Sequence, residues 1–285
     1  MRLHNKILLP VDVNSISKQQ LDTAIALGRS YNSEIIVMSV LPDNILKDSI
    51  KMIVARAITD SLNKVIETIR KEGVVTKKPV IVYGKPEDKI IHIAHEENVN
   101  LILIGSGNKG KSEKFKLGIT AGRLLRLSDI PVWVTDSNDK LRLTNILCPV
   151  DFSDTSRRAL ENAIILSVSF KATLRILAVF EPFINTSQRL SLDEEKENRH
   201  RLKQFEQEVD QFIKEFNLEG INHEVDIQHG FPHEIILRTI EEYCHDLLVM
   251  GTNGRSGLNR FIMGSVTEKV TREMPCSFIT TKGRQ

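Results

Sequence analysis

A glycine-rich segment near the C-terminus has the residue types and spacing to bind an anion. It reads Gly251-Thr-Asn253-Gly254, then nine residues, then Gly264-Ser265. Glycines let backbone N–H groups approach a phosphate with no Cβ in the way. Val266 is expected to begin a helix, whose N-terminus offers free N–H donors and a favourable dipole for negative charge. The competing interpretation is a tight turn and an ordinary helix start, with the Ser265 hydroxyl as cap.

A second candidate is an aspartate that follows an apolar run of the same half. Ile146–Val150 predicts a buried strand, and Asp151 comes directly after it. The glycine-rich segment follows a similar run, Leu247–Met250. In parallel sheets, ligands bind beyond the carboxyl ends of strands, where the strand order reverses. If these strands are neighbours, both segments face one crevice. Asp151 has a competing role as a helix cap, with Ser153 and Thr155 as rival caps.

The first half of the chain contains a diverged copy of the second half. Lys6–Asp12 returns as Asn145–Asp151, a shift of 139 residues from Asp12 to Asp151. Later segments match at a shift of 146, which pairs Gly84-Lys-Pro86 with Gly230-Phe-Pro232. The change from 139 to 146 places a seven-residue insertion between about Pro182 and His223. A repeat of this kind predicts two domains of one fold.

Both copies alternate strands with helices. This pattern predicts an α/β fold with a doubly wound, parallel, five-stranded sheet in each copy and helices on both faces. The length of 285 residues fits two domains, which we expect at residues 1–137 and 144–285. The expected strands are Ile7–Val11, Ile35–Val40, Val80–Tyr83, Leu101–Ile104 and Val132–Thr135 in the first copy, and Ile146–Val150, Leu174–Val179, Glu224–Gln228, Leu247–Met250 and Phe278–Thr281 in the second.

A long helix is expected between the second and third strands of each copy. In the second copy its apolar stripe comprises Leu202, Phe205, Val209, Phe212, Ile213 and Phe216. The charged run Asp193–Arg201 leads into this helix, and we expect it to form a solvated face.

Composition excludes several classes of function. Lys and Arg number 39 and Asp and Glu 37, which argues against a broad nucleic-acid-binding surface. No apolar run approaches the roughly 20 residues of a membrane span, so no membrane partner is expected. No signal peptide is visible, and Cys148, Cys244 and Cys276 form no paired motif, which fits a reducing cytoplasm. No nucleophile–base pair or metal-binding spacing can be named, so no catalytic residue or metal ligand is predicted.

Three features in order resemble the universal stress protein family in its tandem two-domain form: the Pro-Val-Asp strand end, the Gly-x-Pro turn and the G-x2-G-x9-G-S pattern. The resemblance covers nearly the whole chain. It implies two α/β domains of the adenine-nucleotide alpha-hydrolase-like kind, related by a pseudo-twofold axis. One branch of the family binds ATP in the crevice described above. The resemblance therefore implies an adenine nucleotide, ATP with or without magnesium, in the second domain.

The resemblance assigns ten candidate binding residues. The phosphates are implied to lie on Gly251, Asn253, Gly254, Gly264, Ser265 and Val266. The adenine and ribose end is implied to meet Pro149, Asp151, Val179 and Met250. By its own chemistry, Asp151 could accept hydrogen bonds from ribose hydroxyls or from the adenine amine.

The first copy departs from the pattern at two positions. It reads Gly105-Ser-Gly-Asn108, nine residues, then Gly118-Ile119, so that Asn replaces the second glycine and Ile replaces the serine. A lost hydrogen bond to a charged group costs about 1.5–3 kcal/mol, which is roughly one to two decades of affinity. We expect the first site to be weak, empty or reassigned.

The same first-copy loop contains two misleading strings. Gly105–Ser112 matches the P-loop pattern, with Lys111 and Ser112 in the phosphate and magnesium positions. A P-loop normally follows the first strand of its unit, whereas this loop follows the fourth. Gly105–Gly110 also fits a dinucleotide fingerprint, which belongs in the first strand–helix turn. We expect neither to act, and we interpret the lysines of the loop as solvated.

The resemblance also implies pairing through the edges of the fifth strands. Val132–Thr135 and Phe278–Thr281 could pair within one chain, which would remove an aggregation-prone edge. A homodimer of such chains is a further option.

These features favour a nucleotide-dependent stress-response or regulatory module over an efficient enzyme. Two alternatives stay open: a slow ATP hydrolase or phosphotransferase, and a nucleotide-free interaction scaffold. Gly254 and Gly264-Ser265 favour binding over the scaffold. No residue that would activate water for hydrolysis can be identified.

Overall fold

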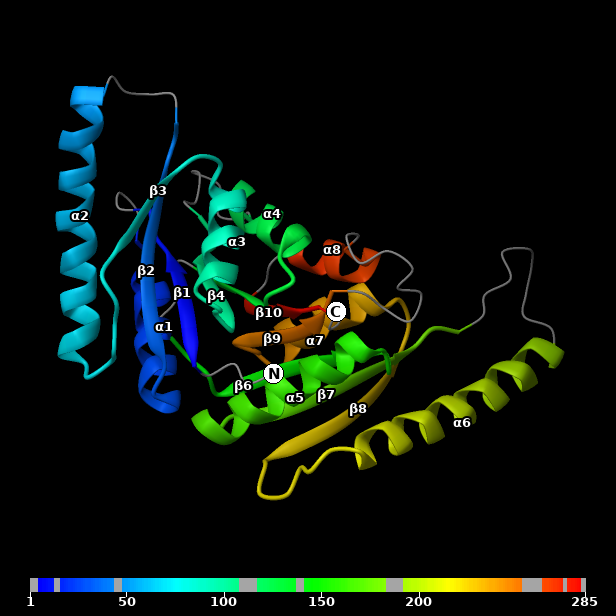
Figure 1. Cartoon of the computed structure of the whole chain (residues 1–285). Coiled ribbons are helices and arrows are strands. Elements are labelled where there is room, and N and C mark those ends of the chain that lie inside the picture. Colours follow the sequence, from blue (N-terminus) through cyan, green and yellow to red (C-terminus); the bar gives the residue numbers. More distant parts are fainter. Residues whose placement is uncertain are drawn as a thin grey trace. The chain divides into compact units, whose positions relative to one another are not determined.

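The chain folds into two α/β units in which strands and helices alternate along the sequence (Figure 1). The computed structural model describes residues 5–12, 16–43, 48–107, 117–136, 141–182, 192–252, 263–273 and 276–282. The first unit contains the described residues up to Arg142 together with those from Arg272 onward. The second unit runs from Leu143 to Thr271.

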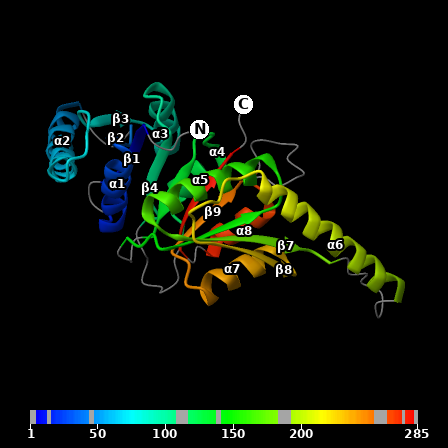
Figure 2. The same ribbon diagram turned by 90° about the horizontal axis from the view of Figure 1, so that it is seen from below.

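The first unit has a mostly parallel sheet in the order β3-β2-β1-β4-β5-β10, in which β10 is antiparallel to β5. Helices α1 and α2 cover one face of the sheet, and α3 and α4 cover the other (Figures 1 and 2). Its elements are β1 (Lys6–Pro10), α1 (Lys18–Tyr31), β2 (Glu34–Leu41), α2 (Asp48–Lys71), β3 (Val80–Tyr83), α3 (Pro86–Glu96), β4 (Leu101–Gly105), α4 (Ile119–Leu127), β5 (Val132–Thr135) and β10 (Ser277–Thr281).

The second unit has parallel strands in the order β9-β6-β7-β8. Helices α5 and α6 lie on one face of this sheet, and α7 and α8 lie on the other (Figure 2). Its elements are β6 (Asn145–Val150), α5 (Asp154–Phe170), β7 (Thr173–Phe180), α6 (Leu192–Lys214), β8 (His223–His229), α7 (Pro232–Glu242), β9 (Leu247–Gly251) and α8 (Ser265–Glu273).

The strand registers reproduce the sequence repeat. Ile7 lies opposite Leu101 in the first unit, and Ile146 lies opposite Leu247 in the second. Ile146 lies 139 residues after Ile7, and Leu247 lies 146 residues after Leu101. These are the two shifts found in the sequence. The α/β fold with tandem, doubly wound sheets is therefore confirmed. Most strands are apolar because helices bury both faces of a parallel sheet, whereas β8 contains the polar residues Glu224, Asp226 and Gln228.

Strand β6 is the point at which the strand order of the second unit reverses. It pairs with β7 on one side and with β9 on the other. The expectation that the strands ending near Asp151 and Gly251 are neighbours is therefore correct. Both strands are deeply buried, as Leu147 and Val249 show with no exposed surface. A rigid core thus fixes where the two candidate segments begin.

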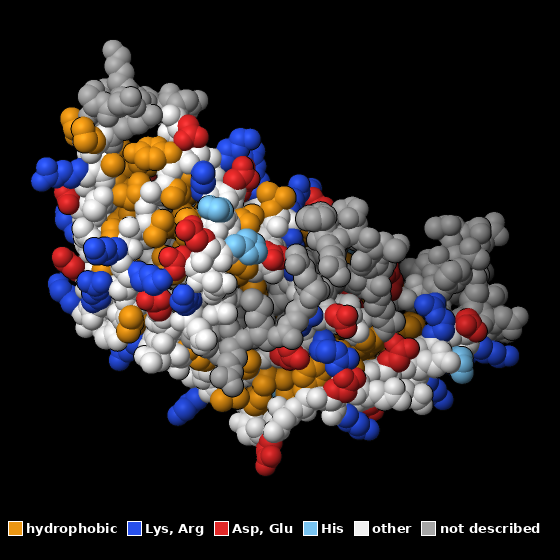
Figure 3. Space-filling model, in the orientation of Figure 1, with side chains coloured by type: hydrophobic (Ala, Val, Ile, Leu, Met, Phe, Trp, Pro, Cys, Tyr) orange, Lys and Arg blue, Asp and Glu red, His pale blue; other side chains and the backbone are white. Residues whose placement is uncertain are grey.

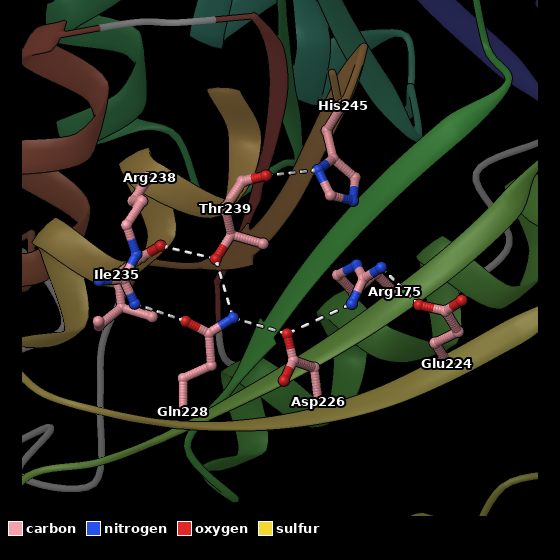
Figure 4. A network of polar contacts seen from close by, with 8 residues as sticks. All are labelled: Arg175, Glu224, Asp226, Gln228, Ile235, Arg238, Thr239 and His245. Carbon is pink, nitrogen blue, oxygen red and sulfur yellow. Dashed lines mark hydrogen bonds and ion pairs between the residues drawn. The ribbon is translucent and has the colours of Figure 1, made fainter. Parts of the chain in front are cut away.

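A polar network joins β7, β8 and α7 in the second unit (Figure 4). The Arg175 guanidinium lies 3.7 Å from the centre of the Tyr243 ring and 2.5 Å from the Glu224 carboxylate. It also contacts Asp226 at 3.3 Å. His245 is buried beside this network, with Nδ1 3.1 Å from the Thr239 carbonyl oxygen. This network anchors the outer strands of the sheet to α7 and to the segment that precedes β9.

Within the described ranges, no helix is both long enough and apolar enough to cross a membrane.

Candidate functional site

A cavity of about 550 Å³ lies at the carboxyl ends of β6, β7 and β9 in the second unit. Six separate segments of the chain contribute to its lining. Eight of the ten residues proposed from the sequence are among them, namely Pro149, Asp151, Val179, Met250, Gly251, Gly264, Ser265 and Val266. The other two, Asn253 and Gly254, lie outside the described residues.

The two ends of the glycine-rich segment are held together by hydrogen bonds. The Gly264 N–H donates to the Thr252 carbonyl oxygen at 2.7 Å. The Thr267 hydroxyl donates to the Gly251 carbonyl oxygen at 2.9 Å. The chain therefore leaves β9 and returns beside it to begin α8, so that the first turn of α8 lines the cavity. N–H groups of a first helical turn have no partner within the helix and are suited to an anion.

Asp151 is held in a turn between β6 and α5. Its Oδ1 accepts hydrogen bonds from the Ser153 N–H at 3.1 Å and from the Ser153 hydroxyl at 2.6 Å. Ser153 is itself the N-cap of α5, because its side chain accepts from the Ser156 N–H. Of the three rival caps, Ser153 is therefore the one used. Asp151 orients this cap while it lines the cavity.

Phe152, which lies between Asp151 and Ser153, has a strained backbone conformation. Its φ of 64° lies in the left-handed region, which is costly for an aromatic residue. Its ring packs 5.5 Å from the ring of Phe205 and 5.3 Å from the ring of Phe212, both on α6. Aromatic contacts of this kind offset part of the strain. They join the turn that carries Asp151 directly to α6.

Helix α6 forms a wall of the cavity that sequence reasoning missed. Arg201, Gln204, Phe205 and Glu208 line it, at spacings of three, one and three residues, which place them on one helix face. The spacing of these four residues can be read from the sequence, but the apolar stripe on the adjacent face of the helix is the stronger pattern. Phe205 belongs to both faces.

The charged run before this stripe is mostly solvated, as expected. Lys196, Glu197, Arg199 and His200 are exposed, and Figure 3 shows acidic and basic side chains interspersed along α6. Arg201 is the exception, because it lines the cavity and its guanidinium lies 5.8 Å from the centre of the Phe180 ring. The expectation of a purely solvated face is wrong for this residue, since it stands one turn before the point where α6 meets β7.

The equivalent region of the first unit contains a larger side chain. Gln20 corresponds to Ala159 of the second copy, which lies 139 residues later in the repeat. Its amide donates to the Pro10 carbonyl oxygen at 2.8 Å and to the Leu103 carbonyl oxygen at 3.1 Å. It thereby joins the last residue of β1 to the middle of β4. The P-loop residues Lys111 and Ser112, together with Asn108, lie outside the described residues.

Comparison with known proteins fits this geometry. The model of the universal stress protein family matches the chain twice, at residues 4–136 and 143–282. The chain belongs to the universal stress protein family. The two matches show its tandem two-domain form. One relative, a universal stress protein of Methanocaldococcus jannaschii, is 31% identical over 140 residues, which cover 48% of this chain and 81% of the relative.

Solved structures extend the likeness to the whole chain. A universal stress protein from Archaeoglobus fulgidus aligns with a TM-score of 0.71 at 25% identity, covering 99% of this chain and 98% of that one. A functionally unknown protein from Pseudomonas aeruginosa aligns with a TM-score of 0.72 at 21% identity, covering 98% of this chain and 92% of that one. The second likeness shows the fold alone.

Proposed function

We propose that this universal stress protein binds ATP, with or without magnesium, in the cavity of its second domain. In this proposal it acts as a nucleotide-dependent regulatory module in a stress response, with domains at residues 1–137 and 144–285. One observation carries the proposal. Residues that the family resemblance assigns to a nucleotide in separate segments, among them Asp151, Val179 and Ser265, line one cavity large enough for a small molecule.

The chemistry of the lining supports this ligand. Ser265 and Val266 begin α8 directly after Gly264, and their backbone N–H groups and the Ser265 hydroxyl can donate to phosphate oxygens. Val179 and Met250 supply apolar surface for a base. The Asp151 carboxylate is an acceptor for ribose hydroxyls. The proposal is of binding rather than turnover.

The test is to purify the chain, denature it and identify any released nucleotide, and then to titrate ATP by calorimetry. We expect one ATP per chain. Ser265→Ala is expected to weaken binding about ten-fold by removing one hydroxyl donor to a charged group. The matched control is Ser169→Ala on α5, which alters an exposed serine away from the cavity.

Three outcomes would change the proposal. Two ATP per chain would contradict the weak first site. The absence of nucleotide and of any ATP-induced shift in melting temperature would favour the interaction scaffold. Steady phosphate release abolished by Gly254→Val would favour an ATP hydrolase.

We further propose that the two domains pair through their fifth strands within one chain. We also propose that the protein is cytoplasmic. β10 is the fifth strand of the second sequence copy, and its antiparallel register on β5, with Phe278 opposite Val134 and Thr280 opposite Val132, supports the pairing. The proposal includes a homodimer as an option. Light scattering over a range of concentrations distinguishes a monomer from a dimer.

A further inference from the structure

The two ends of the cavity in the second unit offer opposite hydrogen-bonding groups. At the end formed by β9 and α8, the described lining contains Ser265 and Val266, whose N–H groups lie in the first turn of α8, and the Ser265 hydroxyl is a further donor. At the end formed by β7 and α6, it contains the carboxylates of Glu181 and Glu208. A carboxylate is an acceptor only. The cavity therefore suits a ligand with acceptors at one end and donors at the other.

The strand order sets the separation of these ends. Strand β6 lies between β9 and β7, so the ends are two strand spacings apart, about 10 Å. Helix α6 follows β7 in the chain and packs on it through Phe205 and Phe180, whose ring centres are 5.6 Å apart. A ligand with its anionic group at α8 thus extends across β6 towards these aromatic rings.

The charges at the α6 end disfavour a second anion. Among the described lining residues, Arg201 is the one basic side chain, whereas Asp151, Glu181 and Glu208 are acidic. The Arg201 guanidinium lies against the face of Phe180. The Gln204 amide nitrogen lies 3.0 Å from a ring nitrogen of His200, one turn earlier on α6. Glu181 and Glu208, both exposed, are the lining carboxylates at this end and can accept hydrogen bonds from a donor-bearing ring.

We propose that Glu181 and Glu208 select the base of the bound nucleotide by accepting hydrogen bonds from its exocyclic amino group. Phe180 and Phe205 pack against the ring system at the same end. The inference rests on the proposed function, since it needs the phosphates to lie at the start of α8. Electrostatic complementarity of this kind gives specificity more than total affinity.

The experiment compares ATP with purine riboside 5′-triphosphate, which has a hydrogen in place of the 6-amino group. Dissociation constants are measured by calorimetry for the wild-type chain and for the double variant Glu181→Met with Glu208→Met. The matched control is Glu206→Met, which removes an exposed carboxylate of α6 from outside the cavity lining. Methionine keeps the unbranched shape of glutamate and its helix propensity but lacks a strong acceptor.

The wild-type chain is expected to prefer ATP by about ten-fold or more, the value of one hydrogen bond to a charged group. The double variant is expected to bind both nucleotides within about two-fold of each other, while Glu206→Met keeps the preference. Equal binding by the wild-type chain, or a preference that survives in the double variant, overturns this inference alone. No binding of either nucleotide by the wild-type chain overturns the proposed function and this inference together.

Discussion

Gly251 and Thr155 approach so closely that a Cβ on Gly251 would lie 2.6 Å from the Thr155 hydroxyl oxygen and 2.9 Å from the Thr155 carbonyl carbon. Gly251 ends β9, and Thr155 lies in the first turn of α5. The glycine is therefore required by the packing of α5 against β9, independently of any ligand. Because Gly251 has no side chain, it allows both the close contact with Thr155 and an open approach to the cavity.

Gly251→Ala is expected to destabilise the second unit by about 1–3 kcal/mol, because the new methyl group must displace backbone of α5. The measurement is the unfolding midpoint in denaturant, followed by circular dichroism. The matched change in the first unit is Gly105→Ala. There the nearest atom is the Gln20 side-chain oxygen at 3.2 Å, which can move, so a smaller loss is expected. Equal losses at both positions would contradict this account.

Asp151→Ala is expected to lower stability by about 0.5–1.5 kcal/mol, because Ser153 loses a hydrogen-bond acceptor that orients the start of α5. Asp151→Asn keeps an acceptor oxygen and is expected to retain most of that stability. Thermal unfolding of both variants without nucleotide measures the structural part. If the asparagine variant is as unstable as the alanine variant, the charge matters more than the acceptor.

Arg175→Met is expected to destabilise the second unit by about 1–2 kcal/mol. It removes the cation–π contact with Tyr243 and leaves the half-buried Asp226 carboxylate without its cationic partner. Arg175→Lys keeps the charge but lacks the planar group that lies on the ring, so an intermediate loss is expected. Denaturant unfolding of both variants checks the order. A lysine variant with wild-type stability would show that charge alone suffices.

Stability is expected to fall at mildly acidic pH because of His245. Burial lowers the pKa of this histidine below its ordinary value of 6.5. The unfolded chain therefore binds a proton at a pH at which the folded chain does not. The stability that the fold has while His245 is neutral in both states is fully present above pH 6.5. It is lost as the pH falls from there towards the lowered pKa of His245.

His245→Asn removes this titration and keeps a donor near the Thr239 carbonyl oxygen. The variant is expected to show a smaller fall in unfolding midpoint between about pH 7.5 and about pH 5.5 than the wild-type chain. An unchanged fall would assign the pH dependence to other groups.

The cysteines are expected to differ in reactivity. Cys148 is fully buried, and burial raises the pKa of its thiol, so it is protected from reagents in the native state. Cys244 is exposed, whereas Cys276 is buried. A coloured disulfide reagent should label one thiol quickly, and Cys244→Ser should abolish this fast phase. A fast phase that persists in the variant would show that a buried cysteine becomes accessible.

Most of the fold could be predicted because its signals are local and repeated. Val80–Tyr83 and Val132–Thr135 are strands with the predicted bounds. Seven of the other eight predicted strands extend by one residue at one or both ends, since hydrogen bonding continues slightly beyond the apolar run, and the first strand begins and ends one residue earlier than predicted. The proline of each Gly-x-Pro turn begins a helix, as at Pro86, because proline suits a first helical turn.

The sequence alone determined the repeat, the α/β fold, the family resemblance and the strand-end segments that meet at the cavity. These follow from periodicity and from the rule that parallel strands end on one edge of a sheet. Only the tertiary structure decided that Arg201 and Glu208 of α6 line the cavity, that Ser153 rather than Asp151 caps α5, and that Gln20 joins β1 to β4 in the first unit. The physical reason is that a helix shows its faces in its sequence, but which polar face meets a neighbour depends on how the helix packs.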